Sequence, residues 1–480
     1  MSLFLPALAT AATAGGSHSA KPNILFIAID DLNDWVGVMK GHPQARTPNI
    51  DRLARGGTLF TNAHCQAPVC GASRASLLMG MLPSTNGIYL LIDDLDLKKS
   101  NAAAARAVFL QDHLKNNGYG TYGVGKIFHN GDKAGVHDDF GGHASFGPYS
   151  PTRFKYDPTW FGRPAITSTD WGAYPERDDL MPDFHVTEYA IAQLGRKHDK
   201  PFFLAAGFNR PHTPWYVPQK WFDLFPLESI ITPPFLPSDM DDIPAMGRRV
   251  NAVNATPTTD WAIETGEWKA IVQAYLACIA FVDHHVGRVL DALEKSPYRD
   301  NTLVILWSDH GYHIGEKNRF AKQSLWERST KVPLIFSGPG IPANQECSKP
   351  VNLLDIYSTI VDYCGLDRPE PLEGRSLRPL IENPSREWPH AAISFWGERN
   401  VAVFSEHHHY IVYEDGSEEF YDLREDPNEW KNLAGEAKYK PLMAEHRRHV
   451  PITSAPMSRY NKLGWNDYWI EKEKAAREAP

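Results

Sequence analysis

Three unbroken apolar runs along the chain predict buried strands of a single sheet. They span residues 23–29, 201–207 and 302–308, and polar, glycine or proline residues follow each of them. A strand that is buried on both faces carries such a continuous run, which is typical of parallel sheets. Segments with apolar residues at helical spacing lie between the runs, as over residues 271–293. This alternation predicts an α/β fold with a large mixed, mostly parallel central sheet flanked by helices.

Beyond residue 372 the pattern changes to short alternating segments, with a Glu414-Asp415-Gly416 turn before the last of them. Such segments predict a small C-terminal α+β subdomain that contains an antiparallel sheet. We therefore expect a main α/β domain over residues 21–372, the part that would carry any catalytic site at its strand ends, and the subdomain over residues 373–480. The expected strands of the subdomain are residues 391–395, 401–404, 410–413 and 420–423.

Residues 141–182 are rich in proline, glycine, tryptophan and tyrosine and show no clear periodicity. Aromatic side chains in such number are costly to leave in water. Long segments of this kind in a folded domain are often functional. We therefore expect an ordered excursion near the functional site instead of a linker.

Composition and charge restrict the possible functions. With 480 residues, of which 42% are hydrophobic and 22% charged, the chain can form an enzyme-sized globular body. Its net charge of −9 argues against broad attraction to nucleic acid or to an anionic membrane. No apolar run reaches the roughly 18 residues of a membrane span, so we expect none. An anionic substrate would need a local cationic pocket.

The first residues and the cysteines give evidence about the cellular compartment of the protein. Residues 3–14 resemble the apolar core and small-residue end of a secretion signal, although no Lys or Arg precedes them. We expect residues 1–20 to be a leader or a disordered tail, and the protein to be periplasmic or secreted. The five cysteines include no CxxC pair, which excludes a disulfide scaffold and the common zinc ribbons.

Polar side chains follow two of the predicted strands. Asp30 and Asp31 come directly after the first apolar run, and Asp309 and His310 after the third. Ligands of open α/β sheets bind outside the carboxyl ends of the strands, where one sheet can bring these side chains together. Adjacent carboxylates need a compensating cation, and oxygen ligands favour Ca²⁺ or Mg²⁺. An Asp-Asp pair alone could also be a turn or a helix cap, but two converging strand ends predict a metal site.

Cys70 lies at the predicted beginning of a helix within residues 68–80. The helix dipole favours negative charge there, and Arg74 adds a positive charge one turn later on the same face. This arrangement indicates a nucleophile that faces an anion. A buried cysteine beside a salt-bridged arginine is the plainer alternative.

The run Asp283-His284-His285 looks like a metal cluster but lies within the helical segment 271–293. Consecutive residues of a helix point in different directions and cannot easily chelate one ion. We expect a packed helix with a polar edge.

The residues Cys70-Gly71-Ala72-Ser73-Arg74 resemble the Cys-x-(Pro/Ala)-Ser-Arg signature of the formylglycine-dependent sulfatases of the alkaline-phosphatase-like superfamily. The resemblance extends from about residue 21 to residue 433, with the two strand-end motifs in the expected order. Within the family the chain is most similar to the iduronate-2-sulfatase-like branch. Ala72 replaces the proline of many members, which bears on the efficiency of maturation. The segments of closer resemblance are Gly125-Lys126-Ile127-Phe128-His129, Arg210-Pro211-His212-Thr213-Pro214 and Phe320-Ala321-Lys322.

The resemblance implies a sulfuric ester hydrolase. A formylglycine-generating enzyme would oxidise Cys70 to formylglycine, and one hydroxyl of the hydrated aldehyde, a gem-diol, would attack sulfur. One Ca²⁺ would withdraw charge from the sulfate. The implied metal ligands are Asp30, Asp31, the matured Cys70, Asp309 and His310, of which the imidazole is the least usual for calcium.

The resemblance also implies roles for the remaining site residues. Arg74, Lys126 and Lys322 would surround the sulfate with positive charge. His129 would accept a proton from the diol, and His212 together with Lys322 would donate one to the departing oxygen. The implied substrate is a sulfated carbohydrate, with removal of sulfate at the end of a polysaccharide or a glycosaminoglycan-like oligosaccharide. The alternatives are a phosphate or phosphonate monoester hydrolase on the same scaffold, and a non-catalytic binder of sulfated glycans if Cys70 is never oxidised.

Overall fold

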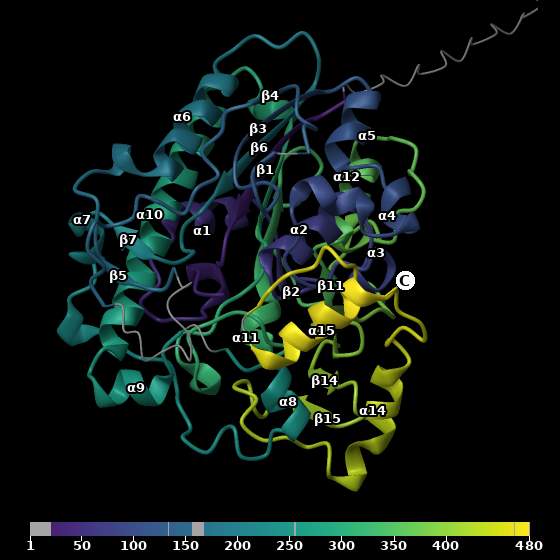
Figure 1. The fold of residues 1–480 in the computed structure, drawn as a ribbon. Coiled ribbons are helices and arrows are strands. Elements are labelled where there is room, and N and C mark those ends of the chain that lie inside the picture. Colours follow the sequence, from purple (N-terminus) through teal and green to yellow (C-terminus); the bar gives the residue numbers. More distant parts are fainter. Residues whose placement is uncertain (1–20, 133, 156–167, 254–255, 465, 480) are drawn as a thin grey trace, which may run out of the picture.

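A computed structural model of the chain describes residues 21–132, 134–155, 168–253, 256–464 and 466–479. The predicted leader over residues 1–20 lies outside the described residues. A nine-stranded sheet occupies the centre (Figure 1). Its strands in spatial order are β10 (Gln345–Cys347), β2 (Gly57–His64), β9 (Lys331–Ser337), β8 (Thr302–Ser308), β1 (Asn23–Ile29), β6 (Phe202–Phe208), β3 (Gly120–Gly125) and β4 (Asp139–Phe140), with β11 (Val351–Asn352) also beside β2.

The central strands match the predicted apolar runs. β1 and β8 coincide with the runs at residues 23–29 and 302–308. β6 is shifted by one residue from the run at residues 201–207. β1 pairs in parallel with β6 on one side and β8 on the other. Only β9 runs antiparallel to its neighbours, β2 and β8. The predicted α/β fold with a mixed, mostly parallel sheet is therefore confirmed.

Helices cover both faces of the large sheet, and each layer of helices has its own apolar core against the sheet (Figure 1). One face is covered by α1 (Pro48–Arg55), α6 (Pro182–Leu194) and α10 (Trp268–Lys295), with α7 (Gln219–Phe222) and α9 (Thr259–Glu264) beyond them. The other face is covered by α2 (Cys70–Met79), α5 (Leu110–Asn116) and α12 (Asp355–Tyr363), with α3 (Pro83–Asn86), α4 (Ala102–Arg106) and α13 (Arg378–Glu382) around them.

α10 extends the predicted helix by a few residues at each end. By length and composition it is the one described helix that could cross a membrane, but most of it is buried inside the protein. Asp283 accepts from the backbone N–H groups of Asn49 and Ile50 (3.1 and 2.8 Å) at the beginning of α1. His285 contacts Thr187, and His284 is exposed. The prediction of a packed helix is confirmed.

A four-stranded antiparallel sheet follows in the C-terminal region, as predicted. Its strands are β12 (Ala392–Phe395), β13 (Val401–Phe404), β14 (His408–Val412) and β15 (Glu418–Asp422). The remaining elements are α8 (Ala245–Val250), α11 (Glu327–Thr330), α14 (Lys440–Arg447), α15 (Asp467–Glu478) and a two-stranded parallel pair, β5 (Trp171–Ala173) with β7 (Trp215–Val217).

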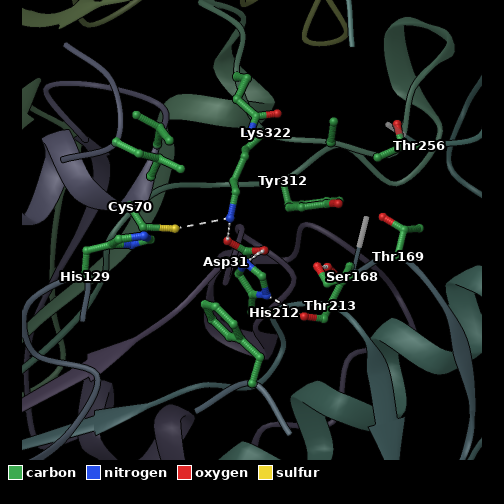
Figure 2. Close-up of a pocket in the computed structure, with 15 residues that line it drawn as sticks. Asp31, Cys70, His129, Ser168, Thr169, His212, Thr213, Thr256, Tyr312 and Lys322 are labelled. Carbon is green, nitrogen blue, oxygen red and sulfur yellow. Dashed lines mark hydrogen bonds and ion pairs between the residues drawn. The ribbon is translucent and has the colours of Figure 1, made fainter. Parts of the chain in front are cut away.

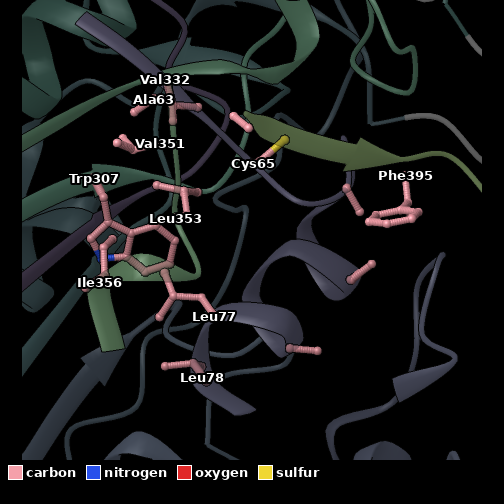
Figure 3. Close-up of a cluster of buried hydrophobic side chains, with 14 of the residues drawn as sticks. Ala63, Cys65, Leu77, Leu78, Trp307, Val332, Val351, Leu353, Ile356 and Phe395 are labelled. Carbon is pink, nitrogen blue, oxygen red and sulfur yellow. The ribbon is translucent and has the colours of Figure 1, made fainter. Parts of the chain in front are cut away.

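The small sheet packs directly on the large one. Phe395 of β12 belongs to the same apolar cluster as Trp307 of β8 and Leu77 of α2 (Figure 3). Farther along, the Asn461 side-chain oxygen accepts from the backbone N–H groups of Tyr89 and Leu90, both at 2.8 Å. The C-terminal region therefore supports the helix that begins at Cys70.

Candidate active site

The carboxyl ends of β1 and β8 lie side by side, because Ile29 pairs with Ser308 in the parallel register. Asp30, Asp31 and Asp309 follow directly and are almost completely buried. The backbone N–H of Asp31 donates to Oδ1 of Asp309 at 3.2 Å. Asp31 has a φ of 63°, a conformation that a non-glycine residue adopts at a cost and that is often found at functional sites. The predicted convergence of the two strand ends is present.

α2 brings Cys70 and Arg74 to these carboxylates. Cys70 is the first residue of the helix, and Arg74 is completely buried one turn later. Nε of Arg74 donates to Oδ2 of Asp309 at 2.8 Å, and Nη1 donates to the backbone carbonyls of Lys126 and Ile127. Arg74 thus ties three segments together, while its Nη2 has no hydrogen-bond partner.

The sulfur of Cys70 lies among positively charged groups. Nζ of Lys322 donates to Sγ at 3.2 Å, and Nε2 of His310 lies 3.1 Å from it. Burial alone would raise the pKa of the thiol, but the charges of Lys126, Lys322 and His310 hold that pKa well below its ordinary value. For His310, burial opposes protonation, yet the charges of Asp309 and Cys70 raise its pKa to about 9. The site is therefore built to hold negative charge at residue 70.

Lys126 reaches the site through a close approach of two strand ends. Gly125 has a φ of 75°, and a Cβ there would lie 2.0 Å from the carbonyl oxygen of Gly207. A Cβ on Gly207 would in turn lie 2.3 Å from the carbonyl oxygen of Lys126. The buried ammonium group of Lys126 pairs with Oδ2 of Asp30. Burial disfavours the charged form of Asp30, but the neighbouring cations lower its pKa.

Lys322 lies on a loop that the C-terminal region holds in place. Its Nζ donates to Oδ1 of Asp31 at 2.6 Å. The buried guanidinium of Arg319 donates to the carbonyl of Lys322, which fixes the backbone of the loop. Earlier in the loop, Nζ of Lys317 pairs with Asp239 at 2.6 Å and donates to the carbonyl of Glu429.

Two histidines complete the group. The ring of His212 has Nδ1 2.5 Å from the carbonyl oxygen of Thr213. A carbonyl only accepts, so Nδ1 carries a proton, and Nε2 is directed towards Oδ2 of Asp31 at 3.8 Å. The ring of His129 lies beside Cys70 (Figure 2). Burial lowers the pKa of this imidazole, although the charge of Cys70 opposes that shift. A neutral His129 can accept a proton.

A cavity of about 240 Å³ opens onto this group (Figure 2). Cys70 and His129 lie on one side of it, and Asp31 and Lys322 lie near its middle. The opposite side carries hydroxyl groups from four residues. These are Ser168, Thr169, Thr213 and Thr256. Five of the predicted site residues lie in the wall and do not line the cavity, namely Asp30, Arg74, Lys126, Asp309 and His310.

The donor set fits a divalent cation with oxygen ligands. The ligand atoms of Asp30, Cys70, Asp309 and His310 lie within 4.8 Å of one another, and so do those of Asp30, Asp31, Cys70 and His212. Oδ1 of Asp30 and Oδ2 of Asp31 are buried without a hydrogen-bond partner. Buried carboxylate oxygens of this kind are costly unless a cation or a donor satisfies them.

All ten residues predicted from the sequence therefore belong to one group, and several supporting residues were missed. Tyr275 donates from its hydroxyl to the carbonyl of Asp31 at 2.7 Å and accepts from the N–H of Asn33 at 3.1 Å. Phe146 and Ser168 line the cavity and lie in the 141–182 segment. The expectation of a functional excursion was the one signal that could have indicated them; residues 156–167 of that segment lie outside the described residues.

A family model described as "Sulfatase" matches residues 22–366. The chain belongs to the sulfatase family. A second model, "N-sulphoglucosamine sulphohydrolase, C-terminal", matches residues 315–453. The chain is 45% identical over 460 residues to a protein of Formosa agariphila named "Sulfatase", which covers 94% of this chain and 91% of that protein. It is 34% identical over 352 residues to human iduronate 2-sulfatase, which covers 69% of this chain and 62% of that protein.

Solved structures share the fold of this sulfatase. One shows a protein in complex with its substrate D-glucosamine-2-N,6-O-disulfate, with a TM-score of 0.70 and 22% identity over 89% of this chain and 96% of that chain. Another is the phosphonate monoester hydrolase of Agrobacterium radiobacter, with a TM-score of 0.71 and 22% identity over 89% and 94%. At this identity the likeness concerns the fold alone. The family and the relatives identify the chain as a sulfuric ester hydrolase.

Removing the Tyr275 hydroxyl should impair the sulfatase site specifically. In Tyr275→Phe, the carbonyl of Asp31 and the N–H of Asn33 lose their buried partner, which costs about 1–3 kcal/mol per unsatisfied group and relaxes the backbone of Asp31. We expect sulfate ester hydrolysis to fall by about tenfold, since small misplacements of catalytic groups have effects of this size.

The matched control is Tyr298→Phe. Tyr298 also makes two hydrogen bonds through its hydroxyl, to the carbonyl of Arg196 and from the N–H of His198. Its ring packs on Phe202, the first residue of β6, and so lies at the end of the sheet opposite to the site. Steady-state kinetics and urea unfolding of both variants check the prediction. Equal activity in the two variants would mean that Tyr275 supports only the fold.

Proposed function

We propose that this sulfatase removes sulfate from a sulfated carbohydrate, with a formylglycine made from Cys70 as the nucleophile. The observation that carries the proposal is the position of Cys70. It begins a buried helix, lies within 3.2 Å of Lys322 and His310, and faces a cavity. An ordinary buried cysteine has its pKa raised by burial, as the four other cysteines do, whereas the pKa of Cys70 is lowered. The site thus stabilises a negatively charged group where the nucleophile is needed.

The oxygens of a hydrated aldehyde at residue 70 would take the place of Sγ among these groups. When bound, one Ca²⁺ would withdraw charge from the sulfate and make the diol more acidic. Asp30, Asp31, Asp309 and His310 would hold it together with residue 70. In its neutral form His310 can serve, because its Nδ1 donates to the carbonyl of Gly311 at 3.0 Å and Nε2 then has a lone pair for the cation.

Positive charge in the site favours the transition state, in which negative charge grows on the sulfate oxygens. Lys322 lines the cavity and would contact the sulfate. Lys126 and Arg74 pair with Asp30 and Asp309 in the wall. Their charges would act on the sulfate at short range. Nη2 of Arg74 lies 3.7 Å from Oδ1 of Asp30 and makes no hydrogen bond there, so it could donate one to the sulfate.

Proton transfer falls to the two histidines. His129, with its lowered pKa and its place beside residue 70, would take the proton of the attacking hydroxyl. His212 would protonate the departing sugar oxygen from Nε2, because Thr213 holds Nδ1. His129 would therefore act on the nucleophile and His212 on the leaving group.

The substrate class rests on the cavity and on the relatives. Hydroxyl groups line the side away from Cys70, and such groups suit the hydroxyls of a sugar. Relatives and structural neighbours carry sugar sulfates in their names. We propose action at the end of a polysaccharide or glycosaminoglycan-like chain, in the periplasm or outside the cell, after maturation by a formylglycine-generating enzyme.

The calcium site is tested by stripping the metal. A ligand that binds only the native state stabilises it by about 2.7 kcal/mol at a hundred times its dissociation constant. We expect chelation to abolish turnover and lower the melting temperature, calcium to restore both, and magnesium to restore less. Calorimetry and thermal unfolding measure the binding without any turnover.

Two variants control this experiment. Asp309→Asn removes a proposed ligand and should abolish the calcium-induced shift in melting temperature. Asp283→Asn changes another buried carboxylate, at the beginning of α1, and should lower the melting temperature but leave that shift intact. Full turnover after verified removal of metal would contradict the proposal.

The substrate class is tested with a panel of sulfated sugars. We expect the mature enzyme to release sulfate from at least one 2-O- or 6-O-sulfated mono- or disaccharide faster than it cleaves phenyl phosphonate esters. Ion chromatography of released sulfate checks this. Faster phosphonate hydrolysis would favour the phosphonate hydrolase alternative, and binding of the sugars without release by fully matured protein would favour the non-catalytic binder.

A further inference from the structure

We infer that Phe146 is a positioning residue for the acid His212. The inference rests on the proposed function, because it takes His212 as the proton donor to the leaving oxygen. The ring of Phe146 stacks on the imidazole of His212, with centroids 4.0 Å apart and planes 15° from parallel. A ring stacked in this way resists rotation of its partner out of the plane. Phe146 thereby fixes the direction in which Nε2 of His212 points.

Two restraints act together on the imidazole. The carbonyl of Thr213 fixes the position of Nδ1 within the ring plane. The stacked ring of Phe146 fixes the tilt of that plane. With either restraint alone, Nε2 could swing away from the reacting oxygen. General acid catalysis requires the donor within hydrogen-bond reach of its acceptor, so both restraints bear on the rate.

Arg210 fixes the position of Phe146 relative to His212, because it hydrogen-bonds to the backbone of both residues. Its buried guanidinium donates through Nη2 to the carbonyl of Phe146 at 2.9 Å and through Nη1 to the carbonyl of His212 at 3.2 Å. The same side chain donates through Nε to Tyr216 at 3.0 Å. Asp183 at the beginning of α6 accepts from the N–H of Arg210 at 3.0 Å. The two loops are thus joined through backbone carbonyls, and the ring contact follows from that junction.

Phe146 also contacts a second site residue. Nζ of Lys126 lies 4.4 Å from the centroid of its ring, within the range of a cation–π interaction. Loss of the ring could therefore act through Lys126 and the sulfate instead of through His212. The two routes differ in their kinetics. His212 would protonate the leaving group, so its loss should matter most for poor leaving groups. Lys126 would stabilise the sulfate, which all substrates share, so its loss should slow all of them.

The experiment compares Phe146→Leu with Phe146→Tyr in matured, calcium-loaded enzyme on 4-nitrophenyl sulfate and phenyl sulfate. Phenolate is the poorer leaving group and needs protonation more. We expect Phe146→Leu to lower kcat on phenyl sulfate by about tenfold and on 4-nitrophenyl sulfate by less than about threefold, since acid catalysis contributes only where the leaving group needs it. KM and the inhibition constant of product sulfate should stay unchanged. Phe146→Tyr keeps the stacked ring and should behave like the wild type.

His212→Ala separates failure of the inference from failure of the proposed function. We expect this variant to lose activity selectively on phenyl sulfate, and Phe146→Leu to add no further loss in its background. If His212→Ala slows both esters equally, His212 is not the acid and the inference falls with that role. If His212→Ala is selective but Phe146→Leu is not, the acid role stands and the inference is overturned. A raised KM or a weakened inhibition by sulfate in Phe146→Leu overturns it as well, in favour of contact with substrate or action through Lys126.

Discussion

The structure of this sulfatase depends on the need to neutralise three carboxylates buried at adjacent strand ends. Asp30, Asp31 and Asp309 are each less than 2% exposed, and a buried charge without a partner is strongly destabilising. Each is met by a cation from a different part of the chain: Lys126 after β3, Lys322 from the loop after β8, and Arg74 from α2. The ion pairs therefore join the helix, the sheet and the C-terminal support into one unit, and two of the carboxylate oxygens, Oδ1 of Asp30 and Oδ2 of Asp31, make no hydrogen bond within it.

The same physical constraints decide what the sequence could predict. β1 and β8 were located to the residue because strands covered on both faces carry unbroken apolar runs, and the Asp residues that end them stood out. β9, the antiparallel member of the sheet, was not predicted; its apolar run contains Pro333 and follows directly on α11. The four strands of the small sheet were predicted to within about two residues, since alternation marks them well.

For the site, the convergence of Asp30, Asp31, Asp309 and His310 followed from the residues, but Lys126, His129, His212 and Lys322 were predicted only through resemblance to the family. A single lysine or histidine has no periodic signal, and its burial results from tertiary contacts. Tyr275, Phe146 and Arg210 were missed for the same reason: each acts through a backbone carbonyl or a ring that a distant segment supplies. Function in this fold thus resides in loops that the predicted sheet positions, and those loops also form the hydroxyl-lined side of the cavity.

We propose that the nucleophile at residue 70, in a site that favours negative charge, is a formylglycine. The most direct measurement is the fraction of Cys70 converted to the aldehyde, read by mass spectrometry of its peptide, against turnover in preparations made with and without a formylglycine-generating enzyme. Turnover per protein molecule should rise in proportion to the aldehyde fraction and extrapolate to zero for the thiol form. Full turnover in a preparation whose Cys70 is entirely thiol would show that the nucleophile is not a formylglycine.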